Sequence, residues 1–482
     1  MNKCTYKFLA CLAIITCFSS CDSKAKDKTI DKDLNNKEWK VYQNLTDSQL
    51  MDTIQYYSMQ YFWNGAEPTS GMARERIMLS NVYPNNDYNV ITTGGSGFGI
   101  MSILVGIYHG WISNDEAIIR FKKILTFLEN ADRYHGAWSH WMYGETGKTK
   151  PFSTKDDGGD LPESAILAQG LICLQEYYKS GTKEEKEIST RAKALWKGID
   201  FNWYQNGKDY LYWHWSPNYE WDMNMPLRGY NETLITYIIG AASTSHQITK
   251  SAWDVGWYQN GSIIDATTKY GITLPIRHLG NHSAGGPLFW AHYSYCGFNP
   301  MITSDKYVNY KTINTAHVML NRAYCIANPK GYPDYGENLW GLTASYSPSN
   351  YKQWEQDGGR ETHISYNPSV LYLSYAAHNP DLDYGVISPT AALSSMPYAP
   401  QEVLKVARNI YENFGTKVFR KYGPIDAFSI EQNWFPEAYL AIDQGPIVCM
   451  IENYRSGFLW NLFMENEDVQ KGLEFLEITI NK

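Results

Sequence analysis

Four carboxylates gather in the segment 155–163, Lys-Asp-Asp-Gly-Gly-Asp-Leu-Pro-Glu, and they are the residues Asp156, Asp157, Asp160 and Glu163. Acids this close repel one another unless a cation, a sugar or a proton makes use of them. A run rich in aromatic residues, His-Gly-Ala-Trp-Ser-His-Trp at 135–141, precedes them. Carboxylates beside tryptophan faces suit carbohydrate, because sugar C–H groups stack on the indole while acids bind the hydroxyls. A plain solvated acidic loop is the alternative.

Three further acids have the setting of proton-transfer groups. Glu232 follows Trp213-His214-Trp215 and Trp221 and, with Asn231, opens an expected helix. As a general acid it would need a pKa raised by burial among these tryptophans, whereas a capping glutamate would need none. Asp426 lies in a long loop, and Asp443 either acts chemically or caps the helix that follows it. A third cluster at Glu355, Asp357 and Glu361 is more typical of a solvated surface.

Other chemistries find little support. The eleven histidines lack the HExxH spacing of a zinc site, and no GxSxG elbow is present. The net charge is −8 and there is no basic run, which argues against a nucleic-acid partner. Seventeen Trp and 38 Tyr are instead an excess that favours sugar or peptide binding. We expect neither a metal nor a cofactor.

The N-terminus predicts export. Residues 1–20 have a basic start and a short apolar run, and Phe-Ser-Ser-Cys at 18–21 resembles a lipoprotein box with Cys21 as the lipidated residue. Residues 21–44 are charged and suit a flexible tether. We therefore expect a protein attached to a membrane only through an N-terminal lipid, in the periplasm or at the outer membrane of a Gram-negative bacterium. The cysteines beyond the signal, Cys173, Cys296, Cys325 and Cys449, are expected to be buried thiols.

Helix signals recur throughout the remaining chain and position these acids. Helices are expected at 47–61, 97–111, 114–128, 163–178, 184–203, 231–242, 287–297, 304–327, 367–377, 400–413, 434–441 and 445–455. Short turns alternate with long loops, and every candidate motif lies in or beside a long loop. Stacked helical hairpins would place all long loops on one rim. We therefore predict a single domain, residues 45–482, that folds as an all-α (α/α)6 toroid of about twelve helices. A two-domain helical protein is the alternative.

A family resemblance follows from motifs spread over residues 45–475. They are Thr-Gly-Gly-Ser-Gly-Phe at 93–98, the acidic segment 152–160, Trp-His-Trp-Ser-Pro at 213–217, Asn-Glu at 231–232, Gly-Gly-Pro-Leu-Phe at 285–289, Trp-Gly-Leu-Thr-Ala at 340–344, Pro-Thr-Ala-Ala at 389–392 and Ile-Asp-Gln-Gly-Pro at 442–446. Together they resemble the glucoamylase-like proteins of glycoside hydrolase family 144.

The resemblance implies an (α/α)6 toroid and an inverting hydrolase of β-1,2-glucan that needs no cofactor, cutting internally or releasing sophorose from an end. It implies that Glu232 is the catalytic acid and Asp426 the base, with Asp443 as a rival. The acids at 156, 160 and 163 would line the substrate cleft.

The full set of expected substrate contacts comprises Asp156, Asp157, Asp160, Glu163, Trp138, Trp141, Trp213, His214, Trp215, Trp221 and Asn231. A glycan-binding lipoprotein without catalysis, or a hydrolase of another linkage on the same scaffold, stays open.

Overall fold

The computed structural model of this chain describes residues 41–81, 83–349 and 372–481. These residues belong to one compact unit, Glu38–Lys482. The predicted signal peptide with Cys21, nearly all of the tether and the acidic cluster at 355–361 lie outside the described residues.

Five helices are apolar on nearly all sides and therefore form an inner layer. They are α2 (Thr93–Tyr108), α4 (Leu161–Tyr178), α6 (Leu234–Ala242), α9 (Pro389–Leu393) and α11 (Ala441–Ser456). A helix that is hydrophobic all round needs neighbours on every side, and nearly every residue of these helices is buried. Two short 3₁₀ segments, η5 (Leu288–Ala291) and η6 (Tyr293–Tyr295), continue the layer where a longer helix was expected at 287–297.

The outer helices pack on this layer from outside. They are α1 (Asp47–Trp63), α3 (Asn114–Asn130), α5 (Lys183–Lys197), α7 (Tyr310–Ala327), α10 (Pro400–Arg408), α12 (Phe458–Met464) and α13 (Glu467–Phe475). On α3, α5, α7 and α10 one apolar stripe is buried and the opposite face is polar. Capping boxes at Thr46, Ser113 and Thr182 start α1, α3 and α5, because each hydroxyl accepts a backbone N–H and the third helical residue returns the bond.

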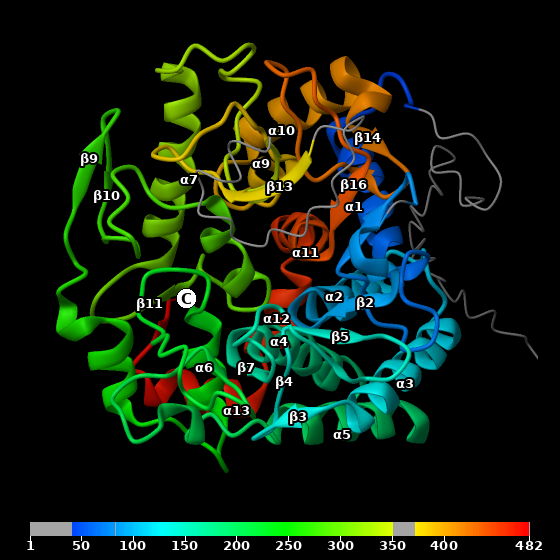
Figure 1. Ribbon diagram of the computed structural model, residues 1–482, viewed down its shortest axis with the longest axis vertical. Helices are drawn as coiled ribbons and strands as arrows, with labels where there is room; N and C mark the ends of the chain where they lie inside the picture. Colours follow the sequence, from blue (N-terminus) through cyan, green and yellow to red (C-terminus); the bar gives the residue numbers. More distant parts are fainter. Residues whose placement is uncertain (1–40, 82, 350–371, 482) are drawn as a thin grey trace, which may run out of the picture. The chain divides into compact units, whose positions relative to one another are not determined.

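The inner layer closes on itself. Helix α2 packs against α4 and α11, α4 packs against α6, and α9 packs against α11, which lies at the centre of Figure 1. Between η5 and α9, His292 Nε2 lies 3.0 Å from Ser395 Oγ, and Tyr398 donates its hydroxyl hydrogen to the carbonyl of Ala291 at 2.9 Å. This closed inner layer inside an outer one is the predicted (α/α)6 toroid.

Glycines let α2 and α4 approach closely. A Cβ on Gly97 would lie 2.3 Å from the carbonyl oxygen of Ile166, and a Cβ on Gly170 would lie 2.3 Å from that of Gly97. The glycine-rich start of α2 thus serves helix packing.

Short antiparallel strand pairs form in the segments that connect the helices. The pairs are β1 (Arg76–Met78) with β16 (Ala438–Leu440), β2 (Val90–Thr92) with β5 (Trp141–Tyr143) and β5 with β6 (Thr149–Lys150), β3 (Arg133–Tyr134) with β4 (Ala137–Trp138), β7 (Gly159–Asp160) with β8 (His214–Trp215), β9 (Thr267–Lys269) with β10 (Ile272–Leu274), β11 (Thr303–Ser304) with β17 (Thr479–Ile480), β12 (Ala344–Ser349) with β13 (Tyr372–Ala377), and β14 (Phe419–Arg420) with β15 (Gly423–Pro424).

Two of these strands correct the sequence prediction. The described end of the expected helix 367–377 is strand β13, and the expected helix 434–441 contains β16. Both strands pair with partners distant in the sequence, so their conformation depends on contacts that a local pattern does not contain.

The N-terminal ends of the inner helices meet at one rim. The long loops lead to these ends, while short turns such as 109–113 and 179–182 join the opposite ends. The partial positive charge of several helix N-termini is thereby directed at the same region.

Two further expectations concern buried groups and membranes. The thiols of Cys173, Cys296, Cys325 and Cys449 are free and buried, as predicted. Among the described helices, none combines the length and the apolar character that a membrane span requires.

Candidate active site

A cavity of about 250 Å³ lies at this rim and gathers several of the predicted residues. Glu163 and Glu232 line it, together with the indoles of Trp141 and Trp213. Its other lining groups are mainly aromatic or apolar and include Phe152, Phe289, Tyr293, Tyr346 and Tyr375. Such a lining, with a few acids among rings, suits a sugar.

Glu232 is held at the mouth of the inner layer, two residues before α6 begins. Ser294 donates its hydroxyl hydrogen to the Glu232 carbonyl at 2.5 Å, which fixes the backbone there. Burial raises the pKa of the Glu232 carboxyl to about 7, and the nearby acids Glu163 and Asp160 add to the effect. A carboxyl with that pKa still carries a proton near neutral pH, as a general acid must.

Asp160 organises the acidic segment. Its Oδ1 accepts the N–H of Glu163 at 2.9 Å and caps α4, and its Oδ2 accepts the indole N–H of Trp213 at 3.0 Å. Glu163 in turn accepts the backbone N–H of Gly94 at 2.7 Å. The starts of α2 and α4 thus meet through one carboxylate.

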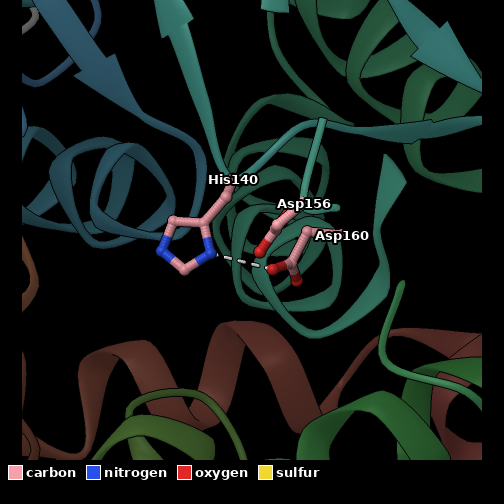
Figure 2. Close-up of side chains that lie close together, drawn as sticks. All are labelled: His140, Asp156 and Asp160. Carbon is pink, nitrogen blue, oxygen red and sulfur yellow. Dashed lines mark hydrogen bonds and ion pairs between the residues drawn. The ribbon is translucent and has the colours of Figure 1, made fainter. Parts of the chain in front are cut away.

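His140 supplies a positive charge to this segment. Its Nδ1 lies 2.9 Å from Asp160 Oδ2, a contact drawn in Figure 2, and its Nε2 lies 4.0 Å from Glu163 Oε1. Burial alone would lower the pKa of His140, but Glu163 and Asp160 outweigh it and raise that pKa to about 10. The imidazole is therefore cationic between two carboxylates. The sequence predicted no role for His140, although it stands in the aromatic run beside Trp141.

His140, Asp156 and Asp160 offer ligand atoms within 4.8 Å of one another, close enough to surround a metal ion (Figure 2). Their chemistry favours a proton instead. Both oxygens of Asp160 already accept hydrogen bonds, and a metal would have to displace the proton of His140. Asp156 has a buried carboxylate oxygen, Oδ1, without a hydrogen-bond partner. Burial, and to a smaller extent the charge of Asp160, raises the pKa of Asp156 to about 7.

Asp426 and Asp443 lie behind the cavity wall and in contact with each other. The two residues are 2 % and 1 % exposed. Asp426 Oδ2 accepts the backbone N–H of Tyr346 at 2.7 Å, and Asp443 Oδ1 accepts the hydroxyl hydrogen of Tyr293 at 3.1 Å. Burial raises the pKa of Asp426 to about 6 and holds that of Asp443 well above its usual range. Tyr375 lines the cavity. Burial raises the pKa of its hydroxyl, and the nearby carboxylates of Asp443, Asp426 and Glu232 raise that pKa further.

Several predicted contact residues lie outside the cavity wall. Trp138 is fully buried and donates its indole N–H to the carbonyl of Leu128 at 3.2 Å, so the expectation of a sugar platform is wrong for it. Asn231 is buried and accepts hydrogen bonds from the backbone and hydroxyl of Thr233. Both residues serve the packing of the fold.

The remaining predicted residues do not line the cavity either. His214 is buried with its Nε2 3.3 Å from Asp156 Oδ1, and Asp157 accepts hydrogen bonds from Ser216 and Asn218. Trp215 and Trp221 pack against Trp203, with ring centres 5.4 and 4.8 Å away, and do not line the cavity. Of the three tryptophans expected to bury Glu232, Trp213 alone lines the cavity with it.

Sequence reasoning also missed the ion pair of Glu75 and Arg76, which lines the cavity. Burial raises the pKa of Glu75 despite the guanidinium beside it. The one available signal was the charged tetrapeptide Ala-Arg-Glu-Arg at 73–76 just ahead of the glycine-rich motif.

A family model described as "Putative glucoamylase" matches residues 224–467. A structure of an endo-β-1,2-glucanase from Chitinophaga pinensis, in complex with sophorotriose and glucose, is 50 % identical, with a TM-score of 0.84 over 90 % of this chain and 99 % of that one. The chain belongs to the glucoamylase-like family of glycoside hydrolase family 144.

Two further relatives support this membership. A structure described as a "putative glucoamylase" from Bacteroides fragilis is 47 % identical, with a TM-score of 0.85 over 92 % of this chain and all of that chain. A curated protein of Parabacteroides distasonis, named as an exo β-1,2-glucooligosaccharide sophorohydrolase acting at the non-reducing end, is 40 % identical over 90 % of this chain. The present chain spans 58 % of the length of that curated relative.

Proposed function

We propose that this chain hydrolyses β-1,2-glucan by an inverting mechanism. The observation that carries the proposal is a carboxyl with a raised pKa, Glu232, facing an aromatic cavity behind which a second acid group, Asp426 with Asp443, is buried. A protein that only captured glycan would need the rings but no acids prepared for proton transfer. The names of the Chitinophaga and Parabacteroides relatives supply the linkage.

In the proposed reaction Glu232 gives its proton to the glycosidic oxygen as the bond to the anomeric carbon breaks. A water molecule adds to that carbon from the opposite face, and Asp426 takes the proton that the water loses. The products are two sugar chains, and solvent returns Glu232 and Asp426 to their starting protonation states. Trp141 and Trp213 would stack on the sugar rings, while Glu163 would accept hydrogen bonds from hydroxyls.

The test is incubation of the purified protein with linear β-1,2-glucan and with β-1,3- and β-1,4-glucans, followed by analysis of the released sugars. Release from the β-1,2-glucan alone supports the proposal. Release from another glucan alone would mean a different linkage on the same scaffold. Binding with no release, by the wild type as well as by Glu232→Gln, would favour the glycan-binding alternative.

The time course of the same reaction separates two modes of attack. A ladder of oligosaccharides indicates cutting within the chain, whereas accumulation of sophorose alone indicates release from an end. Proton NMR of the first product gives its anomeric configuration, and retention of the β configuration would contradict the inverting mechanism.

We propose further that Cys21 carries a lipid that attaches the protein to a membrane. The support is the sequence alone, a short apolar run followed by Phe-Ser-Ser-Cys and a charged tether. Labelling cells with a radioactive fatty acid tests it: the wild type should be labelled and Cys21→Ala should not. An unlabelled wild type in the soluble fraction would overturn this proposal and leave the hydrolase proposal intact.

A further inference from the structure

Two buried carboxyls in direct contact need a proton between them. Asp426 follows β15, and Asp443 is in the first turn of α11; the segment between them folds back on itself, with the Asp426 N–H bonded to the Ala438 carbonyl at 3.0 Å. Their side chains lie close enough for each to shift the pKa of the other, and both residues are almost entirely shielded from solvent. Two ionised carboxylates in such surroundings repel strongly, which makes a shared proton the stable arrangement.

The other contacts show where the proton is needed. Asp426 Oδ2 and Asp443 Oδ1 each have a donor, the Tyr346 N–H and the Tyr293 hydroxyl. Asp426 Oδ1 and Asp443 Oδ2 are buried without a conventional donor. A proton on one acid turns these two oxygens into a donor and an acceptor, so both become satisfied.

The two acids are not equivalent. Asp426 accepts a short bond from a backbone N–H, which stabilises its anion, whereas Asp443 accepts only a neutral hydroxyl. Among the described residues, the other titratable groups that act on the pair are Tyr293, Tyr346, Tyr375 and Glu75, and none of these four is a cation. The nearby cation, Arg76, is engaged by Glu75. These surroundings favour ionised Asp426 and protonated Asp443.

We propose that Asp443 is a positioning residue that holds this proton and donates it in a hydrogen bond to Asp426, thereby orienting Asp426 as the base. The inference rests on the proposed function and assigns different tasks to the two rival acids. Asp443 does not accept a proton from the attacking water. Its hydroxyl donates to Oδ1 of Asp426 and thereby keeps that carboxylate ionised and oriented.

The variants Asp443→Asn, Asp443→Ala and Asp426→Asn test this assignment. Asparagine keeps a hydrogen donor, so Asp443→Asn should lower kcat/KM only about three- to tenfold and leave the acidic limb of the pH profile in place. Alanine removes the donor, so Asp443→Ala should lower kcat/KM about 100-fold and move the acidic limb to higher pH. Asp426→Asn should lose about 10²- to 10⁴-fold, as expected for a missing base.

Asp115→Asn is the matched control, because Asp115 also lies in the first turn of a helix but is exposed. It should behave as the wild type in every measurement. Thermal unfolding followed by circular dichroism shows whether each variant is folded. A folded variant that is merely less stable keeps the acidic limb of kcat/KM at the wild-type pH, whereas loss of the donor moves that limb. An acidic limb that does not move in folded Asp443→Ala, or an Asp443→Asn as inactive as Asp426→Asn, overturns the proposal.

A spectroscopic measurement distinguishes failure of this inference from failure of the proposed function. At about pH 8.5 Glu232 and Asp426 are largely ionised, so the infrared difference spectrum between the wild type and Asp443→Asn should contain a protonated-carboxyl C=O band that is absent from the difference between the wild type and Asp115→Asn. A wild-type-minus-Asp443→Asn spectrum without that band overturns the inference whatever the glucan assays give. A wild type that has the band but cleaves no glucan overturns only the function.

Discussion

His140 Nδ1 lies 2.9 Å from Oδ2 of Asp160. Asp160 belongs to the segment 155–163, which holds four carboxylates in nine residues. The same oxygen accepts the indole N–H of Trp213, so one acid connects a cation, a cavity-lining ring and the cap of α4. The positive charge that this acidic segment requires is thus built into the chain as an imidazolium.

We therefore expect activity to survive removal of divalent cations. Dialysis against EDTA should leave kcat/KM unchanged, whereas His140→Gln should lower it at least tenfold, because glutamine cannot neutralise the paired acids. Elemental analysis before and after dialysis checks that any metal has been removed. Loss of activity on dialysis with recovery on adding one cation would show that the cluster holds a metal.

The pH dependence of kcat/KM should be a narrow bell. The base must be ionised, so activity falls as pH drops through about 6, the pKa of Asp426. The acid must be protonated, so activity falls as pH rises through about 7, the pKa of Glu232. The maximum is expected at about pH 6.5. A profile flat from pH 5 to 9 would contradict this assignment of the two groups.

Glu232→Gln should abolish catalysis and yet stabilise the fold at alkaline pH. The folded-state pKa of about 7 exceeds the ordinary value of 4.5, so the wild type loses stability as pH rises from about 4.5 to 7. The variant has no carboxylate to bury, and its advantage should be on the order of 2 kcal/mol at pH 8 and absent at pH 4. Urea unfolding at the two pH values measures it. If the stability difference between Glu232→Gln and the wild type is the same at pH 4 and pH 8, the Glu232 carboxyl has an ordinary pKa in the folded protein.

Two tryptophans of one loop should respond differently to substitution. Trp213 lines the cavity and Trp221 packs on Trp203, so Trp213→Leu should raise KM about tenfold, roughly 1.4 kcal/mol, and Trp221→Leu less than twofold. Initial-rate kinetics on β-1,2-glucan give both values. A larger effect at Trp221 would place the substrate outside the cavity described.

Gly97 should tolerate no side chain. The Cβ of Gly97→Ala would lie 2.3 Å from the Ile166 carbonyl oxygen, so α2 and α4 would have to separate, at a cost of about 1–3 kcal/mol or more. Gly336→Ala is the control, since nothing lies within 4 Å of its Cβ position. Thermal unfolding compares the two, and equal melting temperatures would refute the close approach of the helices.

Local patterns in the sequence were enough to predict the helices with strong signals and the rim at which the acids gather. The Ser113 capping box and the apolar stripe after it depend on residues three or four apart, and α3 forms where they predicted. The alternation of short turns and long loops likewise placed Glu163 and Glu232 at one end of the ring.

Contacts between distant segments decided what local patterns do not contain. Trp138 and Trp141 are three residues apart and look alike in sequence, yet one fills the core and the other lines the cavity, because strands β4 and β5 pair with different partners. Strand β16 forms where a helix was expected because β1 offers it hydrogen bonds. The contact of Asp426 with Asp443 arises where the segment between them folds back and the Asp426 N–H bonds the Ala438 carbonyl. Burial and pairing energies depend on neighbours brought together by the whole fold. The sequence by itself therefore determined the helices with strong local signals and the candidate acids, while the tertiary structure decided the paired strands and which side chains meet.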